Sequence, residues 1–277
     1  MEDMIFRGMN RDQLDKAYNN TKAVKDFAAV LQSFQKKSRQ VYSQNLVKKN
    51  IPYDHQRSTT FDYFPAGKKN CPTFIFIHGG YWQNCQKEDF AFIANGILAA
   101  GINVVLAEYT LAPQASMTRI VQEIGLLLDY LQQHAGEFNI TPGKVCLSGH
   151  SAGGHLTAIH RGHRLVSHAM PVSALVDLVP ISLCWLNEKL ALTPQEIAQF
   201  SPLYHIDRPG VPTHIHVGGA ELSELIRHSK DLYHALKAAG TRVEYQEVAG
   251  CNHFSLLCEF EKVDGVLVKS LRRLFDA

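Results

Sequence analysis

Apolar residues recur along this chain in two rhythms, one typical of helices and one typical of buried strands. Between residues 10 and 48 they recur every three or four positions, which predicts a helical segment over 10–48. Continuous apolar runs at 73–77 and 104–107 predict strands that are covered on both faces. The chain therefore begins with helix and then changes to strands that lie inside a larger body.

The rest of the chain alternates between these two patterns. Strands alternating with helices are typical of an α/β protein with a mostly parallel, doubly wound sheet and helices on both faces. We expect one domain over 1–277, in which the segment 10–48 and an irregular insertion at 178–207 pack over the sheet, the insertion as a partial lid. The predicted strands are 58–64, 73–77, 104–107, 144–147, 172–176, 214–217 and 242–248, and the later helices are 86–100, 116–135, 155–158, 222–239 and 258–275.

Composition narrows the class of protein. A chain of 277 residues with 45% hydrophobic and 19% charged residues is an ordinary globular protein, and a net charge of +2 favours neither nucleic acid nor a membrane surface. The N-terminus, Met1-Glu2-Asp3-Met4, is unlike a signal peptide, and no run approaches the ~18 apolar residues of a membrane span. Six scattered cysteines without a C-x-x-C predict free thiols and a cytoplasmic location. The sequence neither predicts nor excludes a homo-oligomer.

The segment 149–153, Gly-His-Ser-Ala-Gly, has the pattern G-x-S-x-G between a predicted strand and a predicted helix. In that context the serine lies on a sharp turn with its hydroxyl exposed and near the amides of a helix N-terminus. Ser151 is therefore our candidate for a nucleophile that attacks a carbonyl carbon.

A second signal, His78-Gly79-Gly80-Tyr81-Trp82, directly follows the strand at 73–77. Acyl transfer requires donors for the oxygen that becomes negative, and backbone amides in a glycine loop can approach it closely. We expect Gly80 and Tyr81 to supply these amides from the loop, and Ala152 to supply one from the serine turn.

A nucleophilic serine needs a base, and we choose it among the 14 histidines by its position along the chain. His253 lies between the last predicted strand and the last helix, as the chain order serine, acid, histidine requires. The acid should follow the strand at 214–217, where Glu221 is the first carboxylate. Asp177 and Glu224 are the alternatives for this acid.

Two other kinds of chemistry, at a cysteine and at a metal site, have weaker support in the sequence. Cys251 is near His253 in sequence, but residues two apart on a loop rarely face each other, so we expect it to be a bystander. His214 and His216 alternate onto one strand face, but no third ligand has suitable spacing for a metal. The serine chemistry implies no cofactor and no metal.

These motifs resemble the α/β-hydrolase fold in its hormone-sensitive-lipase-like neighbourhood. The tryptophan that closes His78–Trp82 resembles the HGGxW signature of the kynurenine formamidase (arylformamidase) branch, and 149–154 resembles its GHSAGG motif. The segments 14–20, 218–222 and 227–229 are also similar to that branch, so the resemblance extends from residue 14 to residue 275.

The resemblance implies Ser151 as nucleophile, Glu221 as acid and His253 as base, with the oxyanion loop on Gly79, Gly80 and Tyr81. Many members of the branch have aspartate at the position of Glu221, and glutamate can perform the same task. The branch includes formamidases and general small-acyl esterases, so it implies a reaction type more firmly than a substrate.

We therefore expect a serine hydrolase that removes a small acyl group from an aryl amide or ester, with N-formyl-kynurenine as the first substrate candidate. Tyr18, Tyr81 and Trp82 are candidates for an aromatic wall around the leaving group. A general short-chain carboxylesterase is the alternative activity. A non-catalytic binding protein of the same fold is the alternative of another class.

Overall fold

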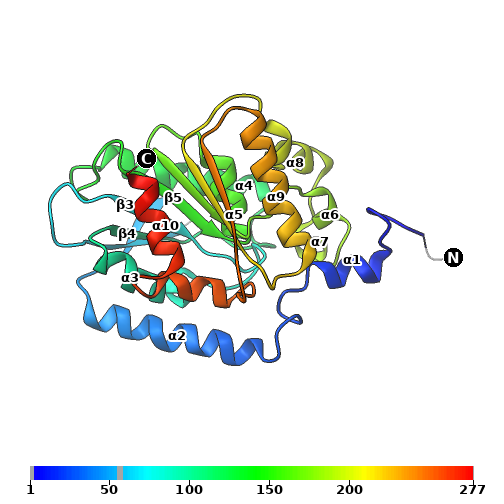
Figure 1. Cartoon of the computed structure of the whole chain (residues 1–277), viewed down its shortest axis with the longest axis horizontal. Helices are drawn as coiled ribbons and strands as arrows, with labels where there is room; N and C mark the ends of the chain where they lie inside the picture. Colours follow the sequence, from blue (N-terminus) through cyan, green and yellow to red (C-terminus); the bar gives the residue numbers. More distant parts are fainter. Residues whose placement is uncertain (1–2, 55–58, 277) are drawn as a thin grey trace.

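A computed structural model of the chain describes residues 3–54 and 59–276, and an eight-stranded sheet forms its centre (Figure 1). The strand order is β1-β2-β4-β3-β5-β6-β7-β8. β2 runs antiparallel to both β1 and β4, and all the later pairs are parallel. The strands are β1 (Lys48–Asp54), β2 (Thr59–Phe64), β3 (Thr73–Ile77), β4 (Asn103–Ala107), β5 (Val145–His150), β6 (His168–Val172), β7 (Thr213–Gly218) and β8 (Val243–Val248).

Helices cover both faces of the sheet. In β3, Phe74 and Phe76 point into one apolar cluster, whereas Ile75 and Ile77 point into the other, because successive side chains of a strand alternate. On the first face lie α2 (Phe27–Gln44), η1 (Lys87–Ile93), α3 (Ala94–Ala99), η3 (Ser255–Phe260) and α10 (Val266–Phe275). On the second lie α1 (Arg11–Ala17), α4 (Met117–Gln133), α5 (Ala152–His160), α6 (Val179–Ser182), α7 (Asn187–Leu190), α8 (Pro194–Gln199) and α9 (Ser223–Ala238), with η2 (Pro202–His205) nearby.

Five predicted elements differ from the structure. Two are helices: the one predicted at 86–100 is η1 followed by α3, and the one predicted at 258–275 is interrupted between η3 and α10. The helical segment 10–48 is two helices with a break at 18–26, and its last residue already belongs to β1, which we did not predict. The strand predicted at 172–176 was wrong, because β6 ends at Val172 and Ser173 takes a φ of +49° that a strand cannot continue. The strand predicted at 58–64 is β2, but Ser58 lies outside the described residues.

The parallel strands bring the loops that matter to one edge. β3, β5, β6, β7 and β8 run in the same direction, so the loops that follow them gather at their carboxyl ends. In open α/β sheets this edge is where ligands bind. Across the residues that the structure describes, no helix has the length and apolar character needed to cross a membrane.

Candidate active site

Ser151 lies at the turn between β5 and α5. Its backbone has φ 57° and ψ −113°, a combination that a residue with a side chain rarely adopts. Its amide donates to the carbonyl oxygen of Val172 at 2.9 Å, and its carbonyl accepts from the amide of His155, so the turn is fixed on both sides. This strained turn is the geometry that the G-x-S-x-G pattern predicts.

Glycine makes the turn possible because the backbone there is tightly packed. A Cβ at Gly149 would overlap the carbonyl of Gly153, and one at Gly153 would overlap the carbonyl of Ile77 at the end of β3. The two glycines therefore let α5 begin directly against β3 and β5.

The loop after β3 approaches the serine turn from the other side. A Cβ at Gly79 would come within 3.3 Å of the Cβ of Ser151, so the two loops are in direct contact. Gly80, Tyr81 and Trp82 have positive φ values of 113°, 59° and 58°. Within residues 3–54 and 59–276, the amides of Gly80, Tyr81 and Ala152 have no protein acceptor.

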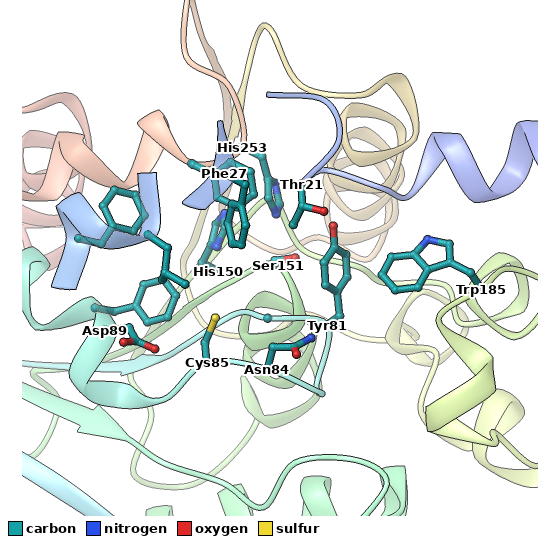
Figure 2. Close-up of a pocket in the computed structure, with 15 residues that line it drawn as sticks. Thr21, Phe27, Tyr81, Asn84, Cys85, Asp89, His150, Ser151, Trp185 and His253 are labelled. Atoms are coloured by element: carbon teal, nitrogen blue, oxygen red, sulfur yellow. The ribbon is translucent and has the colours of Figure 1, made fainter. Parts of the chain in front are cut away.

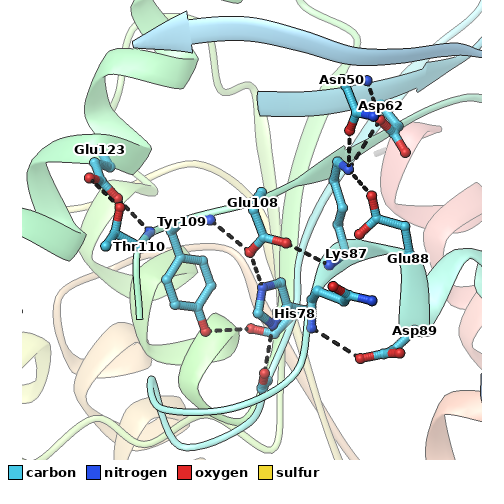
Figure 3. A network of polar contacts seen from close by, with 12 residues as sticks. Asn50, Asp62, His78, Lys87, Glu88, Asp89, Glu108, Tyr109, Thr110 and Glu123 are labelled. Carbon is cyan, nitrogen blue, oxygen red and sulfur yellow. Dashed lines mark hydrogen bonds and ion pairs between the residues drawn. The ribbon is translucent and has the colours of Figure 1, made fainter. Parts of the chain in front are cut away.

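A buried ion pair supports this loop from behind (Figure 3). The Nε2 of His78 lies 2.8 Å from Oε1 of Glu108, and its Nδ1 lies 2.7 Å from the carbonyl oxygen of Gly79. Because both partners are acceptors, both ring nitrogens donate and the imidazole is charged. Burial opposes this charge, but Glu108 and the Gly79 carbonyl outweigh it and raise the pKa of His78. Glu108 also accepts from the amides of Lys87 and Tyr109.

His253 follows β8 and is oriented by Glu221. The Nδ1 of His253 lies 2.6 Å from Oε2 of Glu221, whose side chain is fully buried. The other carboxylate oxygen accepts from the amide of Gly218 at 2.7 Å and from the hydroxyl of Ser173 at 2.6 Å. Glu221 is thereby fixed from the residue after β6, from the end of β7 and from the His253 loop together.

The two alternative acids lie elsewhere. Asp177 accepts from the amide of Val179 at the start of α6. Glu224 lies in the first turn of α9, where it binds the hydroxyl of Tyr18 and the guanidinium of Arg227. Of the three carboxylates that we considered, Glu221 is therefore the one that meets His253.

Ser151 and His253 face the same cavity, which has a volume of about 490 Å³ (Figure 2). In the figure, His253 lies above Ser151 and Tyr81 lies beside it. The size is within the usual range for a small-molecule site. The cavity walls include many aromatic rings and come from five parts of the chain: Thr21, Phe27, Leu31 and Phe34; Gly80, Tyr81, Asn84, Cys85, Asp89 and Phe90; His150 and Ser151; Trp185; and His253 with Phe254.

Two of the three predicted substrate contacts need correction. Tyr81 lines the cavity, but Tyr18 and Trp82 do not. Trp82 is fully buried, with its indole edge-on to the His155 ring at 5.1 Å between ring centres. Tyr18 is also buried, with its hydroxyl among polar groups of α9.

The aromatic walls that the sequence analysis missed come from distant segments. Phe27 begins α2 and packs on Phe254 with ring centres 4.9 Å apart, and Trp185 lies between α6 and α7. Their only sequence signal was membership of the segments 10–48 and 178–207, which we expected to lie over the sheet. The support that Ser173 gives to Glu221 was also missed, although its place just after a parallel strand could have indicated it.

The cysteine and histidine alternatives do not form a second site. Cys251 does not line the cavity, and burial raises the pKa of its thiol, which disfavours the nucleophilic thiolate. The Nδ1 of His214 lies 2.9 Å from the hydroxyl of Ser270 in α10. In the described part of the chain, no group of three or more histidine, cysteine, aspartate or glutamate side chains is arranged to hold a metal ion.

Comparison with known proteins finds hydrolases that are similar over nearly the whole chain. Residues 62–166 match the family model BD-FAE. The kynurenine formamidase of Danio rerio is 26% identical over 97% of this chain and 98% of the relative, and that of Salmo salar is 27% identical over 94% of each. The kynurenine formamidase of Drosophila melanogaster is 25% identical over 89% of each chain.

Solved structures show the same architecture. A putative thioesterase from Silicibacter sp. TM1040 has a TM-score of 0.83 at 25% identity, and covers 94% of this chain and 99% of its own. The carboxylesterase EstE1, cloned from a metagenomic library, has a TM-score of 0.73 at 19% identity, over 90% of this chain and 96% of its own. The mostly parallel sheet and these likenesses give the fold expected from the sequence.

Proposed function

We propose that Ser151, His253 and Glu221 act as the nucleophile, base and acid of this chain. The premise is that the chain is an α/β-hydrolase-fold hydrolase, similar over nearly its whole length to kynurenine formamidases. The observation that carries this proposal is the shared cavity wall of Ser151 and His253, with Glu221 hydrogen-bonded to the far side of the imidazole. A histidine that an acid orients toward the cavity of a serine is the arrangement by which serine hydrolases activate the hydroxyl, and this supports the proposal.

The reaction has two halves. In the first, the Oγ of Ser151 bonds to the acyl carbon while its proton passes to Nε2 of His253; the carbon–nitrogen or carbon–oxygen bond then breaks as His253 protonates the leaving group. In the second, water attacks the acyl-enzyme, His253 takes a proton from it, and the acid is released as Ser151 recovers its proton. Glu221 holds the imidazole in the required tautomer and stabilises its charged form.

The oxyanion of each tetrahedral intermediate would be bound by backbone amides. We assign this role to Ala152 at the N-terminus of α5 and to Gly80 and Tyr81, with Gly79 allowing the loop to contact the serine turn. Free amides in a dry cavity stabilise a developing negative charge without reorganisation. The support of this assignment is that these three amides have no acceptor in the described structure.

The cavity fits a small acyl group on an aromatic leaving group. Its walls include the rings of Phe27, Tyr81, Phe90, Trp185 and Phe254. Together with the similarity to kynurenine formamidases, this makes N-formyl-kynurenine our first candidate. Trp185 belongs to the segment 178–207, which supports a partial-lid role for that segment.

One observation favours a short-chain carboxylesterase as second candidate. No lysine or arginine is among the described residues that line the cavity, so the carboxylate of an amino-acid substrate would find no cation inside it. An uncharged aryl ester avoids the free-energy cost of burying a carboxylate without a cation beside it.

Comparing kcat/KM for N-formyl-kynurenine and phenyl acetate decides between the candidates. The formamidase proposal expects the formamide to be hydrolysed at least as efficiently as the ester, and a large preference for the ester supports the second candidate. The Ser151→Ala variant should lose both activities by several orders of magnitude. Full activity in that variant would end both proposals.

Location and partners stay predictions from the sequence. We expect the protein to act on a small molecule in the cytoplasm, without nucleic-acid or membrane partners. The sequence neither predicts nor excludes a homo-oligomer.

A further inference from the structure

Residues 15–20 connect two parts of the active-site wall with the start of α9. The segment leaves α1 and lies beside the start of α9 and the chain before α7 (Figure 1). Its first link is Asp15, whose carboxylate accepts from the amide of Trp185 at 2.7 Å. This link fixes the cavity-lining part of the segment 178–207 to the N-terminal segment.

The second link is the hydroxyl of Tyr18, which lies 2.8 Å from Nε2 of His228 and 3.0 Å from Oε2 of Glu224. The Nδ1 of His228 accepts from the amide of Val176, so Nε2 carries the proton and donates to Tyr18. Burial lowers the pKa of His228 well below its ordinary value, which agrees with a neutral ring. Tyr18 in turn donates to Glu224, three residues beyond Glu221.

The third link reaches the oxyanion loop. The amide of Asn20 donates to the hydroxyl oxygen of Tyr81 at 2.9 Å. Tyr81 has a φ of 59°, which is costly for a residue with a side chain and persists only where surrounding contacts hold it. The hydroxyl contact and the edge-on packing of its ring against Trp185, 5.3 Å between centres, are such contacts.

From these links we propose that residues 15–20 position the oxyanion loop, with Tyr18 as the residue that anchors the segment and Tyr81 as the residue through which it acts. The proposal rests on the proposed function. Tyr18 does not line the cavity of Ser151 and is a positioning residue, because its hydroxyl fixes the path of the chain that presents Asn20 to Tyr81. It also gives a physical role to the segment 14–20, which resembles the formamidase branch.

The test measures kcat and KM of Tyr18→Phe and Tyr81→Phe on phenyl acetate, per active site titrated with a fluorophosphonate. Each variant keeps the ring and removes one hydroxyl. We expect kcat to fall by about 10- to 100-fold in each, because small displacements of catalytic donors have effects of this size, with little change in KM for Tyr18→Phe. A role in folding alone would lower the titrated fraction and leave kcat per site unchanged.

The double variant makes the test sharper. If Tyr18 acts through Tyr81, the double variant is no slower than the slower single variant, because contacting residues in one network are not additive. Tyr63→Phe is the matched control: its buried hydroxyl donates to the carbonyl of Phe138, away from the cavity, and its kcat should equal that of the unmodified enzyme.

Two results would overturn the proposal: an unchanged kcat per titrated site in both single variants, or effects that multiply in the double variant. Neither result touches the proposed function, which fails only if Ser151→Ala retains activity.

Discussion

The two walls of the cavity beside Ser151 are fixed in different ways. On one wall, His253 is bound by Glu221, which is itself held by Ser173 and the amide of Gly218, all from loops at the ends of neighbouring strands. On the other, the loop of Gly80 and Tyr81 is held from behind by His78, which binds the carbonyl of Gly79, and from the N-terminal segment by Asn20, which binds Tyr81. The first wall follows from the order of strands in the sheet, whereas the second depends on contacts between distant segments. Changes to the first should therefore remove catalysis, and changes to the second should weaken it.

The largest effect is expected on the histidine wall. Glu221→Gln should lower kcat by about 10⁴-fold, because an amide in place of the carboxylate favours the wrong tautomer of His253. Asp177→Asn is the control, since Asp177 binds the amide of Val179 and the hydroxyl of Tyr204 rather than His253, and its kcat should stay near that of the unmodified enzyme. A Glu221→Gln variant as active as Asp177→Asn would remove Glu221 from the mechanism.

A smaller loss is expected from Gly80→Ala on the loop wall. A Cβ at Gly80 would overlap the carbonyl of Asn84, and the φ of 113° disfavours any residue with a side chain. The loop must move, so kcat/KM on phenyl acetate should fall by about 10²- to 10³-fold, the loss known for a missing oxyanion donor. Circular dichroism should show an intact fold. Unchanged kcat/KM in the folded variant would show that the loop amides do not bind the oxyanion.

The support behind the loop predicts a pH-dependent stability. Glu108→Gln should lower Tm by about 4–8 °C near neutral pH, since it weakens a charged hydrogen bond to His78. The pKa of His78 is raised in the folded protein, so its contribution is complete below its unfolded pKa of about 6.5 and is lost as pH rises through the raised value. The pKa of Glu108 is lowered by His78 despite burial, so its contribution is lost as pH falls through that lowered value.

Thermal unfolding across a pH series measures this effect. The difference in Tm between the unmodified protein and Glu108→Gln should be largest at pH values between the lowered pKa of Glu108 and the raised pKa of His78. It should be smaller outside this range. A difference that does not vary with pH would mean that His78 and Glu108 are not a charged pair.

The smallest effect is expected at the mouth of the cavity. Phe27→Ala removes one ring that packs on Phe254, so KM for an aryl ester should rise by about 3- to 10-fold, which is the worth of one aromatic contact, while kcat is unchanged. Kinetics on phenyl acetate check this. A fall in kcat of similar size would place α2 in the chemical step instead.

The sequence predicted the histidine wall well, and the reason is geometric. Parallel strands bring their carboxyl ends to one edge, so Ser151, Glu221 and His253 could be placed there from their positions after predicted strands. The turn at Ser151 was predictable because short-range glycine packing determines it.

The sequence predicted the other wall less well. Tyr18 was expected to contact substrate, but its partners in α9 lie more than 200 residues away and no local pattern reveals them. Trp82 was placed by its motif alone, whereas its position under His155 depends on the packing of α5. The strand predicted at 172–176 failed because Ala174, Leu175 and Val176 are buried, and buried segments are apolar whether they form a strand or a loop.

The roles of Ser151 and His253 are tested most directly by the site at which a fluorophosphonate labels the folded protein, found by mass spectrometry of its peptides. We expect a single adduct on Ser151, formed rapidly in the unmodified protein and lost in His253→Ala. An adduct on another residue, or equal labelling of Ser151 without His253, would contradict these roles.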